Sequence, residues 1–345
     1  LVSGTLYTNA ATGLVDSLSG GVFTYSDANA GAGNKILQVA SVSVLNGTAG
    51  ATANYSITYQ DNTSSTINQK AVTVSGLSAA NKTYNGTTAA VISGTPTVNG
   101  LLTNSAGVID TATVIGTITS GTFVDPNAAN NIGVNLVLSG LSLNNTNYVI
   151  SGTTAGLTAN ITPATVTLTA TKVYDGTNTL TNNQVTIGGL VGTQTLTYSA
   201  ATVDNLNAGS TFINGITLAN GTNGGLASNY SLPSLTATSA NNAVTISKAL
   251  LVVTADNKVM TYGDNSLPTL TARITGFVSG ESASLLTGEA SLTTTATAFN
   301  GTAGSGSVVG GYTITPAVGT LVATNYNFTY VNGSCLLYTS DAADE

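Results

Sequence analysis

Side chains capable of acid–base or nucleophilic chemistry are scarce in this chain. Its 345 residues include no His, no Trp and one Cys, and 14 acidic residues face seven basic ones. Outside the last eleven residues, the only glutamates are Glu281 and Glu289. A glycosidase needs two carboxyl groups within reach of one bond, and nothing in the sequence marks these two as paired. We therefore expect no catalytic residues, no cofactor and no enzyme activity.

Two other kinds of chemistry are open to residues of this chain. Lys172 in an early strand and Asn229 in a late one could form an intramolecular isopeptide bond, with Asp175 as the carboxyl group this reaction needs; the simpler interpretation is a surface Lys with its stem on apolar atoms. Asp256 and Asp264 could contribute to a calcium site, but no acidic residues follow EF-hand spacing. We favour a structural role in both cases and expect no metal site.

The composition indicates an all-β protein. Charged residues make up 6% of the chain and hydrophobic residues 42%. Thr and Val favour strands, while Gly and Asn supply turns. The seven basic residues are scattered, which argues against nucleic acid as a partner. No apolar run approaches the length of a membrane span, so we expect no membrane insertion.

The chain repeats itself, which is the strongest internal signal. A Lys-x-Tyr-Asp/Asn-Gly-Thr motif occurs at 82–87 and 172–177, and a relative, with Tyr-Gly-Asp, at 258–264. An Asn-Tyr pair occurs late in each repeat, at 54–55, 147–148, 229–230 and 325–326. Between them lies an Asp- and Asn-containing segment, at 26–31, 124–128 and 203–209. These landmarks predict repeated small modules.

The landmark residues are interpreted as structural anchors. In the Tyr-Asp/Asn-Gly turn, Tyr would pack on the core of its own module, Asp or Asn would bond the backbone ahead, and Gly would take a positive φ. A buried Tyr in the Asn-Tyr pair would supply apolar area, and its hydroxyl would need one partner. The anchors are Tyr84, Asn85, Gly86, Tyr174, Asp175, Gly176, Tyr262, Gly263, Asp264, Tyr55, Tyr148, Tyr230 and Tyr326.

Short seams follow the Asn-Tyr pairs and set the module boundaries. Each seam reads as a last strand, a Lys or Pro, and the first strand of the next unit. The predicted modules are 1–69 (module 1, truncated at its start), 70–162 (module 2), 163–247 (module 3) and 248–334 (module 4). Short strands between Gly- and Asn-rich turns predict β-sandwich-like modules in an elongated tandem array. A helix over 281–286 would make module 4 β-grasp-like.

These motifs resemble the YDG modules of filamentous-haemagglutinin-like bacterial surface adhesins. Modules 1 to 3 match that pattern, although module 1 lacks its opening Lys-x-Tyr-Asp-Gly. Module 4 resembles the YGX type of MBG module through Tyr262-Gly263-Asp264, Gly311-Tyr312 and Asn325-Tyr326. Residues 335–345 resemble translated sequencing-adapter sequence, so we expect a non-native tail there and a module 4 without its final strand. We also expect the chain to be an internal fragment of a longer protein.

The resemblance implies a role in attachment rather than catalysis. It implies a secreted or cell-surface protein of a Gram-negative bacterium, in which the modules act as a semi-rigid spacer. The implied partners are adjacent modules of the same chain and a ligand on a host or neighbouring-cell surface, such as a glycan. The alternative is a set of weak carbohydrate-binding modules, which would expose aromatic residues at matching positions; Tyr25, Phe123 and Tyr198 are candidates.

Overall fold

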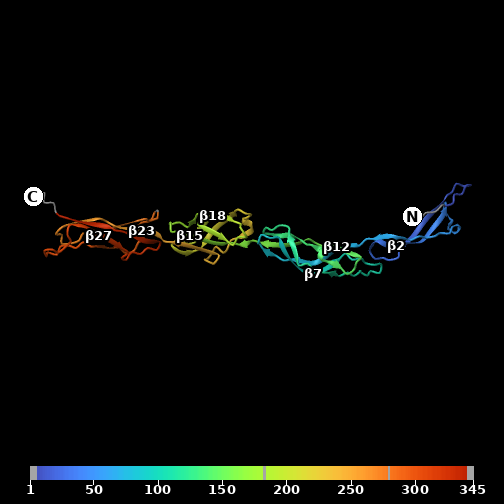
Figure 1. Ribbon diagram of the computed structural model, residues 1–345, viewed down its shortest axis with the longest axis horizontal. Helices are drawn as coiled ribbons and strands as arrows, with labels where there is room; N and C mark the ends of the chain where they lie inside the picture. Colours follow the sequence, from blue (N-terminus) through green and yellow to red (C-terminus); the bar gives the residue numbers. More distant parts are fainter. Residues whose placement is uncertain (1–5, 182–183, 279, 340–345) are drawn as a thin grey trace. The chain divides into compact units, whose positions relative to one another are not determined.

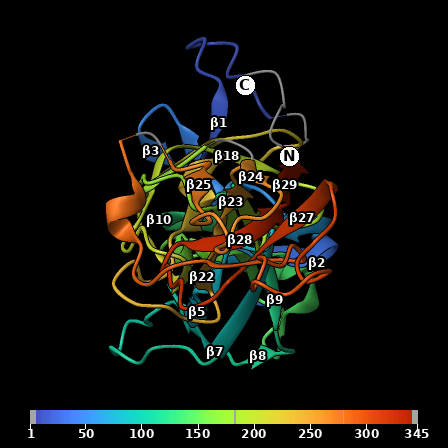
Figure 2. The same cartoon turned by 90° about the vertical axis from the view of Figure 1, so that its left-hand side faces the viewer.

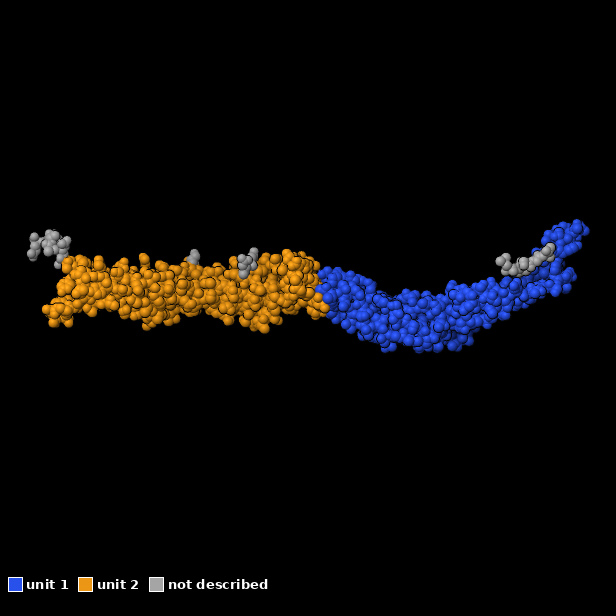
Figure 3. Space-filling model, in the orientation of Figure 1, with its two compact units in different colours: residues 1–82, 86–162 blue, residues 83–85, 163–345 orange. Residues whose placement is uncertain are grey.

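The computed structural model describes residues 6–181, 184–278 and 280–339. Two compact units result: unit 1 contains residues 1–82 and 86–162, and unit 2 contains residues 83–85 and 163–345 (Figure 3). Each unit consists of β-strands joined by loops and single 3₁₀ turns (Figures 1 and 2). The predicted all-β class is thus confirmed. No helix in the described part of the chain has the length and apolar character to cross a membrane.

Unit 1 begins with the single small sheet of module 1. Its elements are β1 (Asp16–Tyr25), β2 (Gly31–Asn46), β3 (Ala49–Gly50), η1 (Thr52–Asn54) and β4 (Asn62–Ile67). β2 pairs antiparallel with β1, β3 and β4. The buried apolar residues here are few, chiefly Val42 and Val44, so this module has a smaller core than the others.

Module 2 completes unit 1. Its elements are β5 (Lys70–Ala79), β6 (Lys82–Thr83), β7 (Ala89–Asn99), β8 (Val114–Ile115), β9 (Ser120–Phe123), β10 (Ala129–Asn135), η2 (Leu138–Gly140), β11 (Ser142–Leu143), β12 (Tyr148–Thr153) and β13 (Leu157–Thr162). Seven of the strands follow the order β12-β5-β7-β9-β10-β13-β6, and β8 pairs with β11. Val74, Phe123 and Ile161 are fully buried and lie in the core of this module.

Module 3 opens unit 2 and packs several small sheets together. Its elements are β14 (Ala164–Thr165), β15 (Thr167–Val173), β16 (Thr179–Leu180), β17 (Val185–Gly188), β18 (Leu196–Val203), β19 (Gly209–Thr211), β20 (Ile213–Asn220), η3 (Ala227–Asn229), β21 (Tyr230–Ser231) and β22 (Asn242–Ser247). One sheet runs β17-β15-β22-β19, another β16-β18-β20, and β14 pairs with β21. Leu168, Ile213 and Ile246 are its fully buried side chains of largest volume.

Module 4 has two sheets, β25-β23-β28 and β24-β29-β27-β26. Its elements are β23 (Ala249–Ala255), β24 (Lys258–Thr261), β25 (Ala272–Thr275), η4 (Ala283–Leu285), β26 (Ser291–Thr294), β27 (Gly310–Ala317), β28 (Tyr326–Val331) and β29 (Gly333–Tyr338). The helical segment predicted over 281–286 is only the 3₁₀ turn η4. Because one such turn cannot cover a sheet face, the β-grasp alternative is not supported.

The prediction that module 4 lacks its final strand is wrong. β29 continues past Ser334 to Tyr338 and pairs with β24 and β27. Cys335 and Leu337 are buried in the module 4 core, whereas Leu336 is half exposed. Alternate apolar residues give this segment one face that a strand can bury. Residues 340–345 lie outside the described residues.

The seams share one pairing scheme. Residues just after each seam pair in parallel with the Asn-Tyr strand of the same module: Lys70 with Tyr148, Ala164 with Tyr230 and Ala249 with Tyr326. The chain then enters a second strand, which in unit 2 pairs in parallel with the last strand of the module, β15 with β22 and β24 with β29. The opening segment of a module therefore takes part in two sheets and ends at the Tyr-containing turn.

Candidate interaction site at the repeated tyrosines

The hydroxyl of the tyrosine in each Asn-Tyr pair accepts a hydrogen bond from the same kind of group. A backbone amide from an earlier segment donates to its hydroxyl at 2.9 to 3.2 Å. The donor–acceptor pairs are Tyr7 N to Tyr55, Leu102 N to Tyr148, Val191 N to Tyr230, and Val278 N to Tyr326. Burying a hydroxyl without a partner would cost free energy, so this amide helps to fix the ring in its module.

Each of these hydroxyls also donates to a polar side chain. The acceptors are Asp16 for Tyr55 at 2.5 Å, Asp110 for Tyr148 at 2.8 Å, Gln194 for Tyr230 at 2.6 Å, and Glu281 for Tyr326. These four acceptors were not recognised in the sequence as members of the repeat. They differ in residue type, but each precedes its tyrosine by 36 to 45 positions. A polar residue at that interval is the signal that could have found them.

In unit 2, two of these tyrosines hold the tyrosine of a Tyr-Asp/Asn-Gly turn. Tyr84 meets Tyr230 edge-on, with ring centroids 5.5 Å apart and an interplanar angle of 78°. Tyr174 meets Tyr326 in the same way, at 5.6 Å and 80°. Edge-to-face aromatic pairs add attraction beyond their buried area. We call each such arrangement, an Asn-Tyr tyrosine with its polar acceptor, a tyrosine socket.

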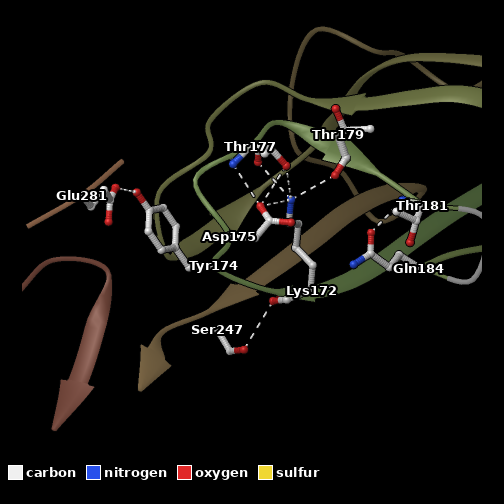
Figure 4. Close-up of polar contacts among 9 residues, drawn as sticks. All are labelled: Lys172, Tyr174, Asp175, Thr177, Thr179, Thr181, Gln184, Ser247 and Glu281. Atoms are coloured by element: carbon white, nitrogen blue, oxygen red, sulfur yellow. Dashed lines mark hydrogen bonds and ion pairs between the residues drawn. The ribbon is translucent and has the colours of Figure 1, made fainter. Parts of the chain in front are cut away.

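One side chain bridges both tyrosines in each filled socket. Gln194 donates from Nε2 to the Tyr84 hydroxyl at 2.8 Å and accepts from Tyr230. Glu281 instead accepts from both partners, at 2.5 Å from Tyr174 (Figure 4) and also from Tyr326. An amide has a donor and an acceptor, whereas an ionised carboxylate only accepts. The incoming hydroxyl is therefore an acceptor in the first socket and a donor in the second.

The Glu281 socket changes the ionisation of its tyrosines. The hydrogen bond to Glu281, followed by burial and the carboxylate charge, raises the pKa of Tyr174 to about 12. Burial, followed by the Glu281 hydrogen bond, raises the pKa of Tyr326 above its usual value. Both effects disfavour a phenolate beside a carboxylate. The two rings thus remain neutral donors well above physiological pH.

The Asn of the Asn-Tyr pair makes a second contact beside the tyrosine socket, and we call this contact the Asn clamp. Asn325 accepts from the Ala208 amide and donates to the Asn207 side chain, both at 2.9 Å. In unit 1, Asn147 accepts from the Ala30 amide at 2.7 Å and donates to Asn29 at 2.9 Å. In both cases the Asn holds the Asp- and Asn-containing segment of the preceding module. In module 4, the adjacent Asn325 and Tyr326 therefore contact two different segments of module 3.

Lysines hold the Tyr-Asp/Asn-Gly turns in shape, and one of them, Lys172, is buried. The Lys172 ammonium donates to the carbonyls of Thr177 and Thr179 at 2.9 Å and pairs with Asp175 at 2.7 Å (Figure 4). Although burial acts to raise it, the Lys172 hydrogen bond and the Thr177 amide hold the pKa of Asp175 below its usual value. Gly176 takes φ 73°. The turn that presents Tyr174 is thus internally braced.

Lys82 braces the earlier turn in a similar way, with bonds to the Thr87 and Ala89 carbonyls at 2.8 and 3.3 Å. Gly86 takes φ 75°. In module 4 the corresponding residues are Tyr262, Gly263 and Asp264: Asp264 accepts from the Thr261 amide at 2.8 Å, Gly263 has φ 97°, and Tyr262 is 51% exposed.

The interpretation that each turn tyrosine packs in its own module is wrong for Tyr84, whose ring and hydroxyl contact Tyr230 and Gln194 of module 3, and for Tyr174. Its ring contacts Tyr326 and its hydroxyl bonds to Glu281, both in module 4. Tyr174 can reach module 4 because it follows the end of β15 and projects beyond its own sheet. The Asn-Tyr tyrosines Tyr148, Tyr230 and Tyr326 are 3 to 5% exposed, and their hydroxyls have two partners rather than one.

The other candidate groups have separate roles. Lys172 bonds to the turn at 175–179 rather than to Asn229, which is buried in η3. Asp256 accepts from Thr271, and Asp264 from Thr261. Within the described residues, no three His, Cys, Asp or Glu side chains come close enough to hold a metal ion.

The carboxylates and aromatics considered for sugar chemistry do not form matched sets. Both oxygens of Glu281 bond to tyrosines, and Glu289 lies exposed in a different loop. Phe123 is 1% exposed, whereas Tyr25 is 44% exposed. The Tyr198 hydroxyl bonds to the backbone of Thr181 and Val185. These three aromatics therefore do not repeat one exposed position.

Comparison with known families agrees with these repeats. The YDG domain model matches residues 68–155 and 158–240, and the MBG domain (YGX type) model matches residues 251–336. The chain belongs to the YDG and MBG domain families. The filled sockets lie inside these matches, whereas β22, the last strand of module 3, lies outside them. No curated protein matches the chain.

Proposed function

We propose that these YDG and MBG domains form a spacer segment of a secreted bacterial surface adhesin, in which each domain is held firmly to the next. The observation that carries the proposal is the junction of modules 3 and 4. Tyr174 of the YDG domain enters the socket of Tyr326 and Glu281, while Asn325 of the MBG domain grips Ala208 and Asn207.

Two separated contacts restrain a junction better than one. A single contact would act as a pivot, whereas the tyrosine socket and the Asn clamp bind two different segments of module 3. The seam itself is short, since β22 ends at Ser247 and β23 begins at Ala249. Lys248 lies between them and donates to the Ala323 carbonyl at 2.9 Å. This supports a stiff junction, which is the property that a spacer needs.

The spacer proposal is tested by measuring the distance between modules 3 and 4 in the full chain. Spin labels would be placed at Ala219→Cys and Val308→Cys, both exposed, because Cys335 is buried and would not react. We expect a narrow distance distribution that broadens when Tyr174→Ala and Asn325→Ala are combined. An equally broad distribution before and after the double substitution would contradict a clamped junction.

A matched control separates loosening from general destabilisation. Tyr312→Phe removes a hydroxyl that bonds to Val308 within module 4, and Asn327 is an exposed Asn on the same strand as Tyr326. The pair Tyr312→Phe and Asn327→Ala should leave the distance distribution narrow.

A further inference from the structure

Tyrosine is the main oxidisable side chain of this protein. The chain has 14 Tyr but no Trp, one Met and one Cys. Met260 and Cys335 are 5% and 0% exposed in the core of module 4, and exposure largely decides whether a sulfur-containing side chain is oxidised. A one-electron oxidant that acts on this chain therefore takes its electrons mainly from tyrosines.

Two of these tyrosines touch across the junction of modules 3 and 4. The rings of Tyr174 and Tyr326 meet edge-on with their centroids 5.6 Å apart, so carbon atoms of the two rings lie in van der Waals contact, about 4 Å from one another. The ring torsion of a tyrosine has a broad energy well, which lets one ring turn toward the other without movement of its domain. Phe277 also packs against Tyr326, but it has no phenolic hydroxyl and does not compete.

Glu281 supplies the base that the oxidation of a tyrosine needs. A phenol that loses an electron becomes strongly acidic and passes its hydroxyl proton to a hydrogen-bonded acceptor. Tyr174, at 2.5 Å, and Tyr326 both donate to Glu281, and an ionised carboxylate can take the proton of either. Because the pKa of Tyr174 is raised to about 12, this tyrosine is not deprotonated beforehand at neutral pH. Glu281 is only half-buried and can release the proton to solvent.

The other filled socket has the same ring contact without this base. Tyr84 and Tyr230 meet with centroids 5.5 Å apart at 78°, but the bridging residue is Gln194. Its amide nitrogen donates to Tyr84 and its amide oxygen accepts from Tyr230. A neutral amide can accept a hydrogen bond, yet it is too weak a base to take up a phenolic proton. The two sockets therefore differ in their proton acceptor rather than in their rings.

Burial confines coupling to the two rings of the socket. Tyr174 and Tyr326 are 5% and 3% exposed, so a radical on either ring has no contact with a second protein molecule. The phenol ring that it touches is its socket partner. Tyr7 and Tyr262, in contrast, are 63% and 51% exposed, and their coupling would join separate chains.

We propose that the Glu281 socket is a site of oxidative cross-linking, at which a one-electron oxidant derived from a peroxide joins Tyr174 to Tyr326 as dityrosine. The bond makes the contact between modules 3 and 4 covalent. This inference goes beyond the spacer function, because it assigns a reaction to the junction. It shares with that proposal only the contact between the two tyrosines.

The reaction removes two electrons and two protons from the pair. Each tyrosine gives one electron to the oxidant and its hydroxyl proton to Glu281, which releases the proton to water. The two phenoxyl radicals combine through a new bond between their ortho carbons. The hydrogens on these carbons then move, as protons, to the phenolic oxygens and restore both hydroxyls. The peroxide takes up the two electrons, and its O–O bond breaks.

The test oxidises the full chain, at low protein concentration, with persulfate and a photoexcited ruthenium complex. Trypsin cleaves after Lys and Arg, so Tyr174 falls in peptide 173–248 and Tyr326 in peptide 274–345. We expect these two peptides as a linked pair that has lost two hydrogen atoms, and Tyr174→Phe should abolish the pair. Absence of the pair, or cross-links confined to exposed tyrosines such as Tyr7 and Tyr262, would overturn the proposal.

Exchange of the two bridging residues separates the base from the ring contact. Glu281→Gln should keep the urea midpoint of the chain and lose the cross-link, because Gln194 shows that an amide can hold two tyrosines. Gln194→Glu should do the reverse and create a link between Tyr84 and Tyr230. It decides the matter if Glu281→Gln fails to fold. An undiminished cross-link in Glu281→Gln, or no new link in Gln194→Glu, would refute the carboxylate as the base and with it the proposal.

The spin-label test of the spacer is performed without oxidant, so the two proposals can fail separately. A narrow distance distribution in a chain that does not cross-link would refute the dityrosine site alone. A broad distribution in a chain that does cross-link would refute the stiff junction alone.

Discussion

The hydroxyl of Tyr174 donates a 2.5 Å hydrogen bond to Glu281, although 107 positions separate the two residues. Tyr174 belongs to the YDG domain of module 3 and Glu281 to the MBG domain that follows. Glu281 also accepts from Tyr326 of its own domain. A residue first considered for catalysis thus joins two domains through their tyrosines.

Glu281→Gln should be tolerated, because Gln194 already performs the bridging role in the other socket. The amide would accept from Tyr326 and donate to Tyr174, so we expect the free energy of unfolding to change by less than about 1 kcal/mol. Glu281→Ala leaves hydroxyl groups without their acceptor and should cost about 2–3 kcal/mol. Denaturant unfolding would measure both, with Glu289→Ala as an exposed control. Equal damage by Gln and Ala would show that the negative charge, not the hydrogen bonding, holds the junction.

Stability should fall at alkaline pH in a way that depends on Tyr174. Its pKa is raised from 10.0 to about 12 in the folded state, with the Glu281 hydrogen bond as the main cause. The contribution is fully present below about pH 10 and is lost as the pH rises through about 12. Urea midpoints across this range should fall less steeply in Tyr174→Phe. Identical pH dependence in the two proteins would contradict a shared Tyr174–Glu281 site.

Asn325→Ala should expose the Ala208 amide to solvent exchange. The Asn325 side chain is the acceptor for this amide at 2.9 Å, and Ala cannot replace it. We expect hydrogen exchange at Ala208 to accelerate at least about tenfold and the unfolding free energy to fall by about 1 kcal/mol. Asn327→Ala, an exposed position on β28, serves as the control. Unchanged protection of Ala208 would mean that another group fixes this segment.

Gly176→Ala should be more damaging than Gly263→Ala. Both glycines have a positive φ, 73° and 97°, which an L side chain adopts with strain of about 1 kcal/mol. Only at Gly176 would the new Cβ meet another domain, at 3.0 Å from Val278; around Gly263 there is open space. We expect an additional loss of about 1 kcal/mol for Gly176→Ala, measured by thermal unfolding. Equal losses would indicate that the turn does not press on Val278.

Truncation after Ser334 should disrupt module 4. It would remove Cys335 and Leu337, which are 0% and 1% exposed, together with the pairing of β29 to β24 and β27. Loss of two buried side chains predicts a destabilisation of at least about 3 kcal/mol. A chain ending at Tyr338 retains β29 and should unfold like the full chain. Equal stability of both truncated proteins would show that the module does not depend on this strand.

The sequence predicted the all-β class and the repeated motifs because these depend on local turn chemistry and alternation. It did not predict that Tyr174 leaves its own module, since a buried Tyr has the same sequence signature whichever core receives it. The sequence did not identify Asp110, Gln194 and Glu281 as equivalent acceptors. Three residue types can accept a hydrogen bond from a tyrosine hydroxyl, so no single residue recurs at this position of the repeat. The sequence did not predict the strand at 333–338, because residues 335–345 resemble adapter sequence even though every second residue from Cys335 to Leu337 suits a buried strand face.

The parallel pairing of β15 with β22 has a mechanical consequence. These are the opening and closing strands of module 3, and they pair from Leu168–Asn242 to Val173–Ser247. Tension applied through the two ends of the module would pull the strands past one another along their length. The hydrogen bonds between them would then be loaded together, in shear, rather than broken one after another. A domain whose end strands pair in this way resists unfolding by force applied along the chain.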